Sequence, residues 1–476
     1  RGGPRCNAAG DQCGKDFIES RVLLGKDGYL TNRHTECTDC HNPHRATKNR
    51  LFTDNPATPD ASGTHKHSIL TGDTAPHNNL ASGSLRGTFG VEPAGYLSAE
   101  FGTDPTNFDV KRGDSGISVF TDIASTYVTR EYQVCLKCHS SYAFDNISPP
   151  LLPSSGLTGG TQSGTNGVTD YSDVAMEFQA PLSHQGEPIG GTTDSGASDT
   201  YSANNHRSWH PVMAKTGRTA TERPGTDINL WRTPWNGADA DAAPAAIVTA
   251  VGEQTMHCSD CHGSTTNMVD GVVPVNGDVD GVWGPHGSNE AFILKGTWET
   301  DAPSTHNTGT NNLCFRCHDE NQYADASATP AITLSSAFSE TASSLPNLHQ
   351  RHAYLTTQGG TAAAPLWPAP GSGNDAYRCT MCHTGTAHGW KNKAFLANLN
   401  DLGPEISALG GEIAPVLGTL NTGDAVPKGT SAAAAFSFPA GYSNGPYYRG
   451  TLLSVDATLG FRASGEWTKA SCTGCH

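Results

Sequence analysis

Six times along the chain, two cysteines three positions apart are followed directly by a histidine, as in Cys37-Thr-Asp-Cys40-His41. On one turn of helix both thiols lie on the same side, and the imidazole of the next residue lies beside them. This spacing suits two thioether bonds to the vinyl groups of one porphyrin and an iron bond from the histidine, and it is typical of covalent haem c attachment. We therefore expect six covalently attached haem c groups.

The cysteines of these motifs are Cys37, Cys40, Cys135, Cys138, Cys258, Cys261, Cys314, Cys317, Cys379, Cys382, Cys472 and Cys475. The histidines expected as proximal iron ligands are His41, His139, His262, His318, His383 and His476. Zinc knuckles are the alternative, because cysteines at this spacing also bind zinc. A zinc site does not need histidine directly after the second cysteine. Since histidine supplies only 20 of 476 residues, its presence in all six copies favours haem.

The composition offers little material for a large aliphatic core. Hydrophobic residues make up 36% of the chain, which also contains 54 glycines and 29 prolines. A porphyrin is a large rigid apolar plate, and loops wrapped around it bury surface that side chains would otherwise supply. We therefore expect a mostly irregular chain with few short helices and minor β structure, wrapped around six haems without a large conventional core.

The motifs are unevenly spaced, which argues against a repeat solenoid. We expect one elongated unit over residues 1–476, with short helical turns at the motifs. Longer helices are expected over residues 392–402 and 405–420, and a short strand over 117–120. Two cysteines outside the motifs, Cys6 and Cys13, suit a disulfide in an N-terminal arm over residues 1–33; two thiols are the alternative.

The formal net charge of −16 argues against nucleic acid as a partner, since nucleic acid binds basic surfaces. No apolar run approaches the ~20 residues of a membrane-spanning helix, so no span is expected. Haem attachment to such motifs takes place outside the cytoplasm. We therefore expect the mature form of an exported protein, which passes through a periplasm and resides outside the cell or on its surface.

Fourteen histidines lie outside the motifs, whereas the whole chain has only five methionines. Histidine on both faces of the iron keeps the haem potential low, and it leaves no open position for a substrate. The inventory therefore favours six bis-histidine haems that carry electrons. Which spare histidines serve as distal ligands does not follow from the composition.

The surroundings of the motifs resemble the multihaem c-type cytochromes of metal-reducing bacteria. The similar segments include Cys40-His41-Asn-Pro-His44, Asn205-His206-Arg-Ser-Trp-His210, Gly284-Pro-His286, Asn347-Leu-His349 and Ala387-His388-Gly-Trp390. In that family, outlying histidines of this kind are distal ligands, often to a haem other than that of the adjacent motif. The resemblance implies distal roles for His44, His210, His286, His349 and His388, and His77 is expected as the sixth. The substitutes are His34, His206, His257 and His352.

Weaker patterns include Asn276-Gly-Asp278-Val-Asp280, which has part of the look of a calcium loop. Glycine occupies position 287, where such a loop would need a glutamate, so a plain turn is the simpler interpretation.

The function expected is electron transfer, not catalysis. The resemblance extends to hexahaem subunits of extracellular cytochrome filaments, or nanowires, and implies a homopolymer in which one subunit donates a distal histidine to the next. Its redox partners would include external electron acceptors. The alternatives are a discrete outer-surface or periplasmic electron carrier or metal reductase and, less favoured, a multihaem reductase with an open iron site.

Overall fold

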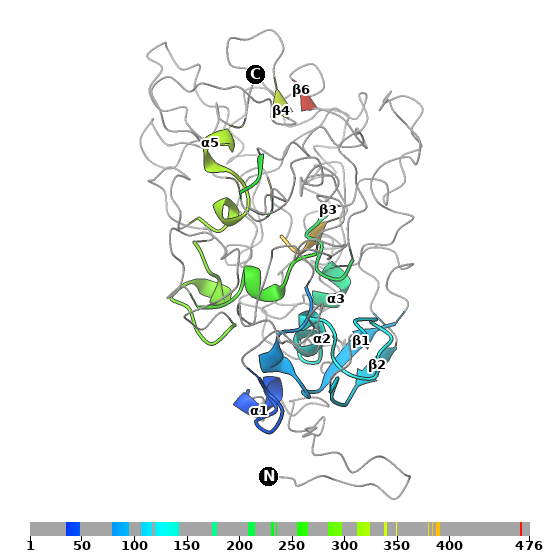
Figure 1. Cartoon of the computed structure of the whole chain (residues 1–476). Coiled ribbons are helices and arrows are strands. Elements are labelled where there is room, and N and C mark those ends of the chain that lie inside the picture. The colour runs from blue at the N-terminus through cyan, green and yellow to red at the C-terminus, as the bar shows by residue number, and fades with distance from the viewer. Residues whose placement is uncertain are drawn as a thin grey trace, which may run out of the picture.

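The structure is a computed structural model in which fourteen helices and strands are described, each of two to six residues (Figure 1). The residues described are 35–47, 79–94, 105, 107–116, 120–140, 142, 174–178, 208–214, 230–232, 235, 255–264, 284–297, 312–323, 338–339, 349, 379, 383, 387–390 and 467–468.

Short helices mark the haem-type motifs. The α-helices are α1 (Cys37–Cys40), α2 (Glu131–Leu136), α3 (Val174–Glu177) and α5 (Glu320–Tyr323). The 3-10 helices are η2 (Gly83–Leu85), η7 (Cys258–Asp260), η9 (Ala291–Ile293) and η10 (Cys314–Arg316). Four of these eight helices contain motif cysteines, so the expected helical turns at the motifs are present in the first four copies.

Each motif turn begins where a side chain accepts hydrogen bonds from backbone amides. The Asp39 carboxylate accepts the Glu36 N–H at 2.6 Å, and the Asp260 carboxylate accepts the His257 N–H at 2.7 Å. Before α2, the Gln133 side-chain oxygen accepts the Thr129 N–H at 2.8 Å. Such contacts satisfy amides at the helix start that lack an intrahelical partner. They stabilise turns too short to persist alone in water.

The strands form three two-stranded sheets within the described residues. β1 (Gly90–Pro93) pairs antiparallel with β2 (Phe108–Lys111), with Val91 opposite Val110. β3 (Ser208–Trp209) pairs antiparallel with β5 (Gly389–Trp390), and β4 (Phe338–Ser339) pairs parallel with β6 (Trp467–Thr468). The β1–β2 sheet lies beside α2 near one end of the described structure, and α5 lies toward the other end (Figure 1).

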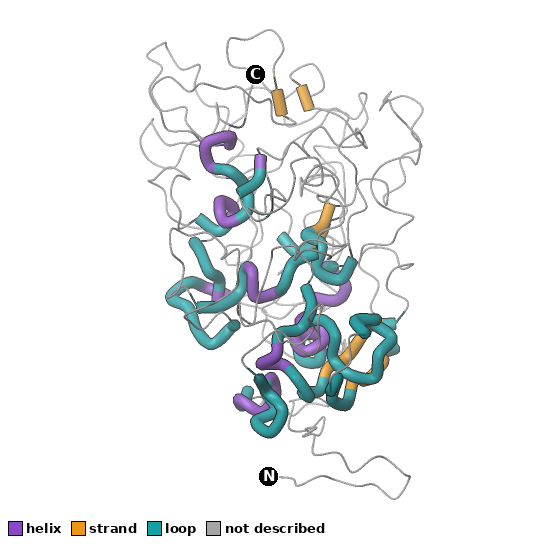
Figure 2. The backbone as a smooth tube through the Cα atoms, viewed as in Figure 1, coloured by secondary structure: helices purple, strands orange, loops and turns teal. Residues whose placement is uncertain are grey.

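The largest apolar cluster of the described residues gathers side chains from six segments. Its buried members are Phe89, Val91, Tyr132, Leu136, Ala175, Phe178, Val212, Met213, Trp235 and Met256. The partly buried thiols of Cys258, Cys261 and Cys317 pack against this cluster. The residues that would attach haem therefore lie at the edge of the core, and the described chain between them is mostly loop (Figure 2). For the part of the chain that the structure describes, the expectation of mostly irregular backbone with few short helices and little β structure is confirmed.

Several expectations concern residues that lie outside the described part. These are the helices over 392–402 and 405–420, the N-terminal arm with Cys6 and Cys13, and most of the strand over 117–120. Phe120, the last residue of that strand, is described and lies in a loop with 73% of its surface exposed. Among the residues that the structure describes, no helix has the length and apolar character needed to cross a membrane.

Candidate functional site

The first five motifs share one backbone hydrogen bond, from the histidine N–H to the carbonyl of the first cysteine. Its length is 2.9 Å at His41, His139, His262 and His383, and 3.0 Å at His318. Each of the first four motifs therefore closes one helical turn that holds two sulfurs and one imidazole in a repeated local arrangement. Of the expected site residues, Cys382, Cys472, Cys475, His476 and His77 lie outside the described part.

The first motif packs against the second. The Cys40 thiol contacts the cluster of Ala81, Val128 and Val134, and Val134 belongs to the helix of the second motif. The Lys137 ammonium, which lies between the two cysteines of the second motif, donates to the Asp39 carbonyl of the first. These contacts hold two motifs together although they are far apart in sequence.

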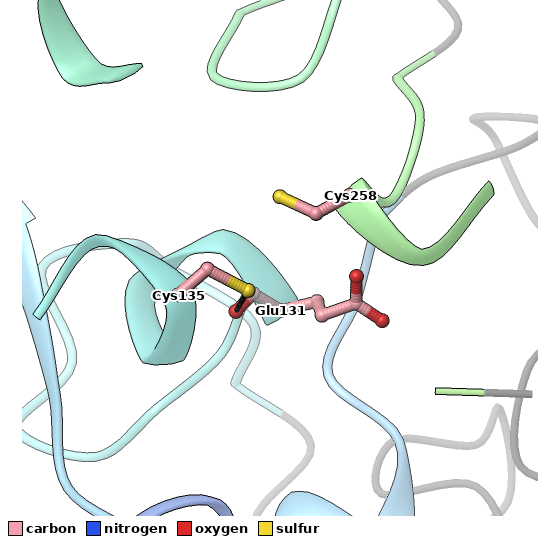
Figure 3. Close-up of side chains that lie close together, drawn as sticks. All are labelled: Glu131, Cys135 and Cys258. Atoms are coloured by element: carbon pink, nitrogen blue, oxygen red, sulfur yellow. Dashed lines mark hydrogen bonds between the residues drawn. The ribbon is translucent and has the colours of Figure 1, made fainter. Parts of the chain in front are cut away.

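The second motif packs against the third through one buried carboxylate. Glu131, at the start of α2, accepts hydrogen bonds from the Ser259 N–H at 2.8 Å and from the Ser259 hydroxyl at 2.7 Å. Ligand atoms of Glu131, Cys135 and Cys258 lie within 4.8 Å of one another, and Figure 3 shows the three side chains close together, with the two cysteines on different motifs. These three residues could hold a metal ion only while both sulfurs remain unattached thiols.

The thiols lie in surroundings that disfavour their ionised form. Burial raises the pKa of Cys40 and of Cys138 to about 11, and that of Cys261 to about 12. For Cys135, the hydrogen bond with Cys258 and then burial raise the pKa. Within the described residues, moreover, no pair of cysteines from one motif forms a cluster with a third ligand.

The third, fourth and fifth motifs follow in the same way. The Lys295 N–H donates to the Cys261 carbonyl at 2.8 Å, and the Lys295 carbonyl accepts a bond of 2.8 Å from the Arg316 guanidinium. Arg316 lies between the cysteines of the fourth motif, and Phe315 beside it packs against Cys379 of the fifth. The five described motifs thus contact one another in sequence order.

Three motif histidines lie opposite three spare histidines at nearly equal separations. The ring centres of His41 and His286 are 5.9 Å apart with planes at 5°, and those of His349 and His383 are 6.0 Å apart at 12°. The rings of His262 and His388 are also 6.0 Å apart, but their planes cross at 45°. His286, His349 and His388 were all expected as distal ligands.

The second ring nitrogen of several of these histidines meets a backbone carbonyl. Nδ1 of His41 lies 2.9 Å from the Ser84 oxygen, and Nδ1 of His262 lies 2.8 Å from the Phe292 oxygen. Nδ1 of His210 contacts the Ala387 oxygen. A carbonyl can only accept, so Nδ1 carries the proton and Nε2 keeps the lone pair that binds a metal. His257 is arranged differently, since its Nε2 lies 3.1 Å from the Leu80 oxygen.

His210 and His388 lie on neighbouring loops beside the β3–β5 pair, where the His210 N–H donates to the His388 carbonyl at 3.1 Å. Burial first, and then the positive charges of His210 and His383, lower the pKa of His318 to about 3. His210 therefore lies near the histidine of the fourth motif. Burial and then the charge of His388 likewise lower the pKa of His262, to about 4.

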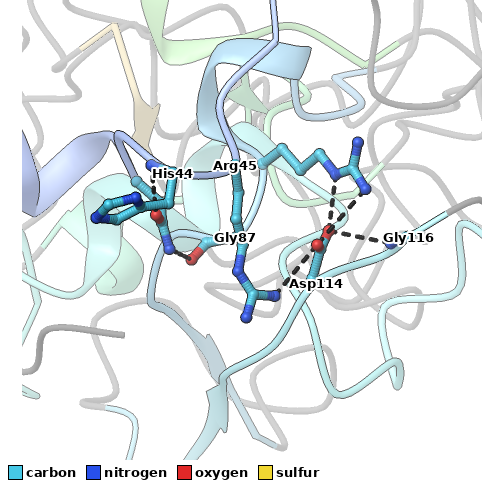
Figure 4. Close-up of polar contacts among 7 residues, drawn as sticks. His44, Arg45, Gly87, Asp114 and Gly116 are labelled. Carbon is cyan, nitrogen blue, oxygen red and sulfur yellow. Dashed lines mark hydrogen bonds and ion pairs between the residues drawn. The ribbon is translucent and has the colours of Figure 1, made fainter. Parts of the chain in front are cut away.

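His44 is an exposed candidate that follows the first motif. Its backbone N–H donates to the Asn42 side chain at 3.1 Å, and the residue is exposed. Figure 4 shows its ring pointing away from Asp114, which accepts bonds from Arg86 at 2.7 Å and Arg45 at 3.2 Å. Among the described residues, no ring contact joins His44 to a motif histidine.

Sequence reasoning missed the groups that join the motifs. Glu131 and Ser259 gave no signal, because nothing local shows that their segments meet. Lys137 and Arg316 did offer a signal, because each is a cation between the two cysteines of a motif, at a position that needs no ligand.

Comparisons with protein-family models, with curated proteins and with solved structures find no match for this chain.

Proposed function

We propose that the chain carries electrons along a row of covalently attached haem c groups, each held between two histidines. The observation that carries the proposal is the separation of the three histidine pairs. Two imidazoles that bind one metal ion from opposite sides, each through a bond of about 2.0 Å, have ring centres about 6 Å apart. The pairs of His41 with His286, of His383 with His349 and of His262 with His388 have this separation.

The chemistry of the residues fits a porphyrin at each motif. The Nδ1 bonds of His41 and His262 direct Nε2 to the metal. Arg316 is 4% exposed, and its Nε and one terminal nitrogen have no hydrogen-bond acceptor within the described residues. A porphyrin carries two carboxylates, which would supply acceptors to buried donors of this kind.

The row of motif-to-motif contacts supports transfer between haems. Iron would supply the redox chemistry when bound, and the chain would fix the spacing and orientation of the rings. With histidine on both faces, iron has no position for a substrate, so this proposal is electron transfer and not catalysis. We extend it to an extracellular filament of identical subunits that passes electrons to external acceptors, with a discrete surface or periplasmic carrier as the alternative. This extension rests on the resemblance to filament-forming multihaem cytochromes.

The test uses the mature protein isolated from a host that attaches haem c. Intact-mass spectrometry should give six porphyrins per chain, and the oxidised spectrum should be that of low-spin iron. A chain with unmodified cysteines would overturn the haem assignment and would revive a metal site at Glu131, Cys135 and Cys258. Electron microscopy of native material addresses the extension separately, since discrete particles would remove the filament and leave electron transfer standing.

A matched pair of variants tests the ligand assignment. His286→Ala should convert one haem in six to a high-spin form, because the iron bound by His41 would lose its second imidazole. His257→Gln is the control, since the Nε2 of His257 already contacts the Leu80 carbonyl and glutamine can donate there in its place. Equal spectra for His286→Ala and the unaltered protein would contradict the pairing.

A further inference from the structure

Two consecutive residues of the η9 turn adopt a backbone conformation that their side chains disfavour. Phe292 has φ of 58° and Ile293 has φ of 55°, both in the left-handed region. A β-branched residue there is a true outlier, because its side chain crowds the backbone. The side chains gain little in return, since Phe292 is 53% exposed and Ile293 43% exposed. Interactions of the backbone must therefore hold this turn.

Four of those interactions involve the third motif or the glycine that follows it. The Phe292 carbonyl meets Nδ1 of His262 at 2.8 Å, and the Ile293 carbonyl accepts the Gly263 N–H at 2.7 Å. Leu294 forms a β-bridge with His262, and the fully buried Lys295 donates its N–H to the Cys261 carbonyl. Residues 292–295, which we call the clasp, thus contact the end of the third motif and the glycine directly after it. Strain of this kind persists where the surroundings impose it, and it often marks a functional site.

The clasp fixes the direction of one imidazole. The Nδ1–H of histidine points along the plane of its ring, so the position of the Phe292 oxygen constrains the rotation of the His262 ring. The His388 ring is placed independently: its backbone is held by the bond from the His210 N–H, and the ring itself packs against the Phe178 ring at 4.8 Å. The two planes cross at 45°, whereas the other two histidine pairs cross at 5° and 12°.

We propose that the clasp is a positioning element that holds the His262 imidazole out of line with that of His388, so that the third motif has a haem with twisted axial ligands. This inference rests on the proposed function. The relative orientation of two axial imidazoles governs the splitting of the iron d orbitals, and the largest g value of low-spin ferric iron rises as the planes turn away from parallel. The third haem would then differ electronically from its neighbours without any change of ligand.

The experiment compares two substitutions at one exposed position of the full haem-loaded protein. Ile293→Pro forbids a positive φ and should open the clasp, whereas Ile293→Gly permits it at no steric cost. In low-temperature electron paramagnetic resonance of the oxidised protein, the unaltered chain should show a species with a larger maximal g value than its near-parallel haems. Ile293→Pro should shift or remove that species, and Ile293→Gly should retain it with a raised Tm.

Each outcome decides the matter. An unaltered protein that carries six low-spin haems but lacks a species of larger maximal g value overturns the inference, whether or not the proline variant folds. It is also overturned if the proline and glycine variants give the same spectrum at equal haem content. A chain without haem removes the proposed function, and this inference with it; intact mass distinguishes that case from the others.

Discussion

Replacing Glu131 with alanine should weaken the joint between the second and third motifs by about 2–4 kcal/mol in the free energy of unfolding. The carboxylate accepts both the backbone N–H and the hydroxyl of Ser259, at 2.8 and 2.7 Å. Ser259 is 2% exposed, so water cannot replace the lost acceptor. A hydrogen bond to a charged group contributes about 1.5–3 kcal/mol, and a buried donor without an acceptor costs about 1–3 kcal/mol. Removal of a buried charge offsets part of this loss.

Glu131→Gln refines the prediction, because its amide oxygen can still accept one of the two bonds. Its expected loss is about 1 kcal/mol. The assay is guanidinium unfolding of the haem-loaded protein, followed by circular dichroism in the far ultraviolet and in the main haem band. Asp109→Ala, at an exposed position of β2, serves as the control and should change stability by less than about 0.5 kcal/mol. If Glu131→Ala unfolded at the same midpoint as this control, the carboxylate would not join the two motifs.

Three other changes test the surroundings of the first two motifs. Burial raises the pKa of Glu92 above 4.5, so the folded chain holds this proton more tightly than the unfolded chain does. The stability that this group contributes therefore falls as the pH rises from 4.5 through the raised pKa. Glu92→Gln should flatten this part of a stability profile measured from about pH 4 to pH 8. Gly87→Ala should lower the free energy of unfolding by about 2 kcal/mol or more, because Gly87 has φ of +72° and an added Cβ would lie 2.4 Å from the Cδ of Arg45. An unchanged Tm would contradict this contact. Burial alone would raise the pKa of Asp114, but the bonds from Arg86 and the Gly116 amide and the nearby positive charges outweigh it and lower the pKa below 3.8. The stability that Asp114 contributes is therefore complete above pH 3.8 and is lost as the pH falls through its lowered pKa. Asp114→Asn should lower the free energy of unfolding by about 1 kcal/mol at neutral pH, by less in high salt, and not at all in strong acid.

The distal histidines illustrate how far sequence reasoning reached. It selected His286, His349 and His388 as distal ligands, and the structure brings each of them opposite a motif histidine. It could not say which motif each would face, because the pairing depends on loops that close over long stretches of chain. His44 was selected for its place directly after a motif, yet a residue three positions beyond the motif histidine can point to solvent as readily as inward. His257 was listed as a substitute, and its Nε2 contacts a backbone carbonyl instead.

The sequence was enough to predict the number of Cys-x-x-Cys-His motifs and the helical turn that the described motifs form. The hydrogen bond from the histidine N–H to the first cysteine carbonyl spans four residues, so it is a local feature, and it is present in the five motifs whose histidine the structure describes. Tertiary structure alone decided that Glu131 joins two motifs and that the Phe292 carbonyl fixes the His262 ring. Both contacts lie between segments that are distant in sequence, and they form only when packing lowers the free energy enough to offset the entropy of closing those loops.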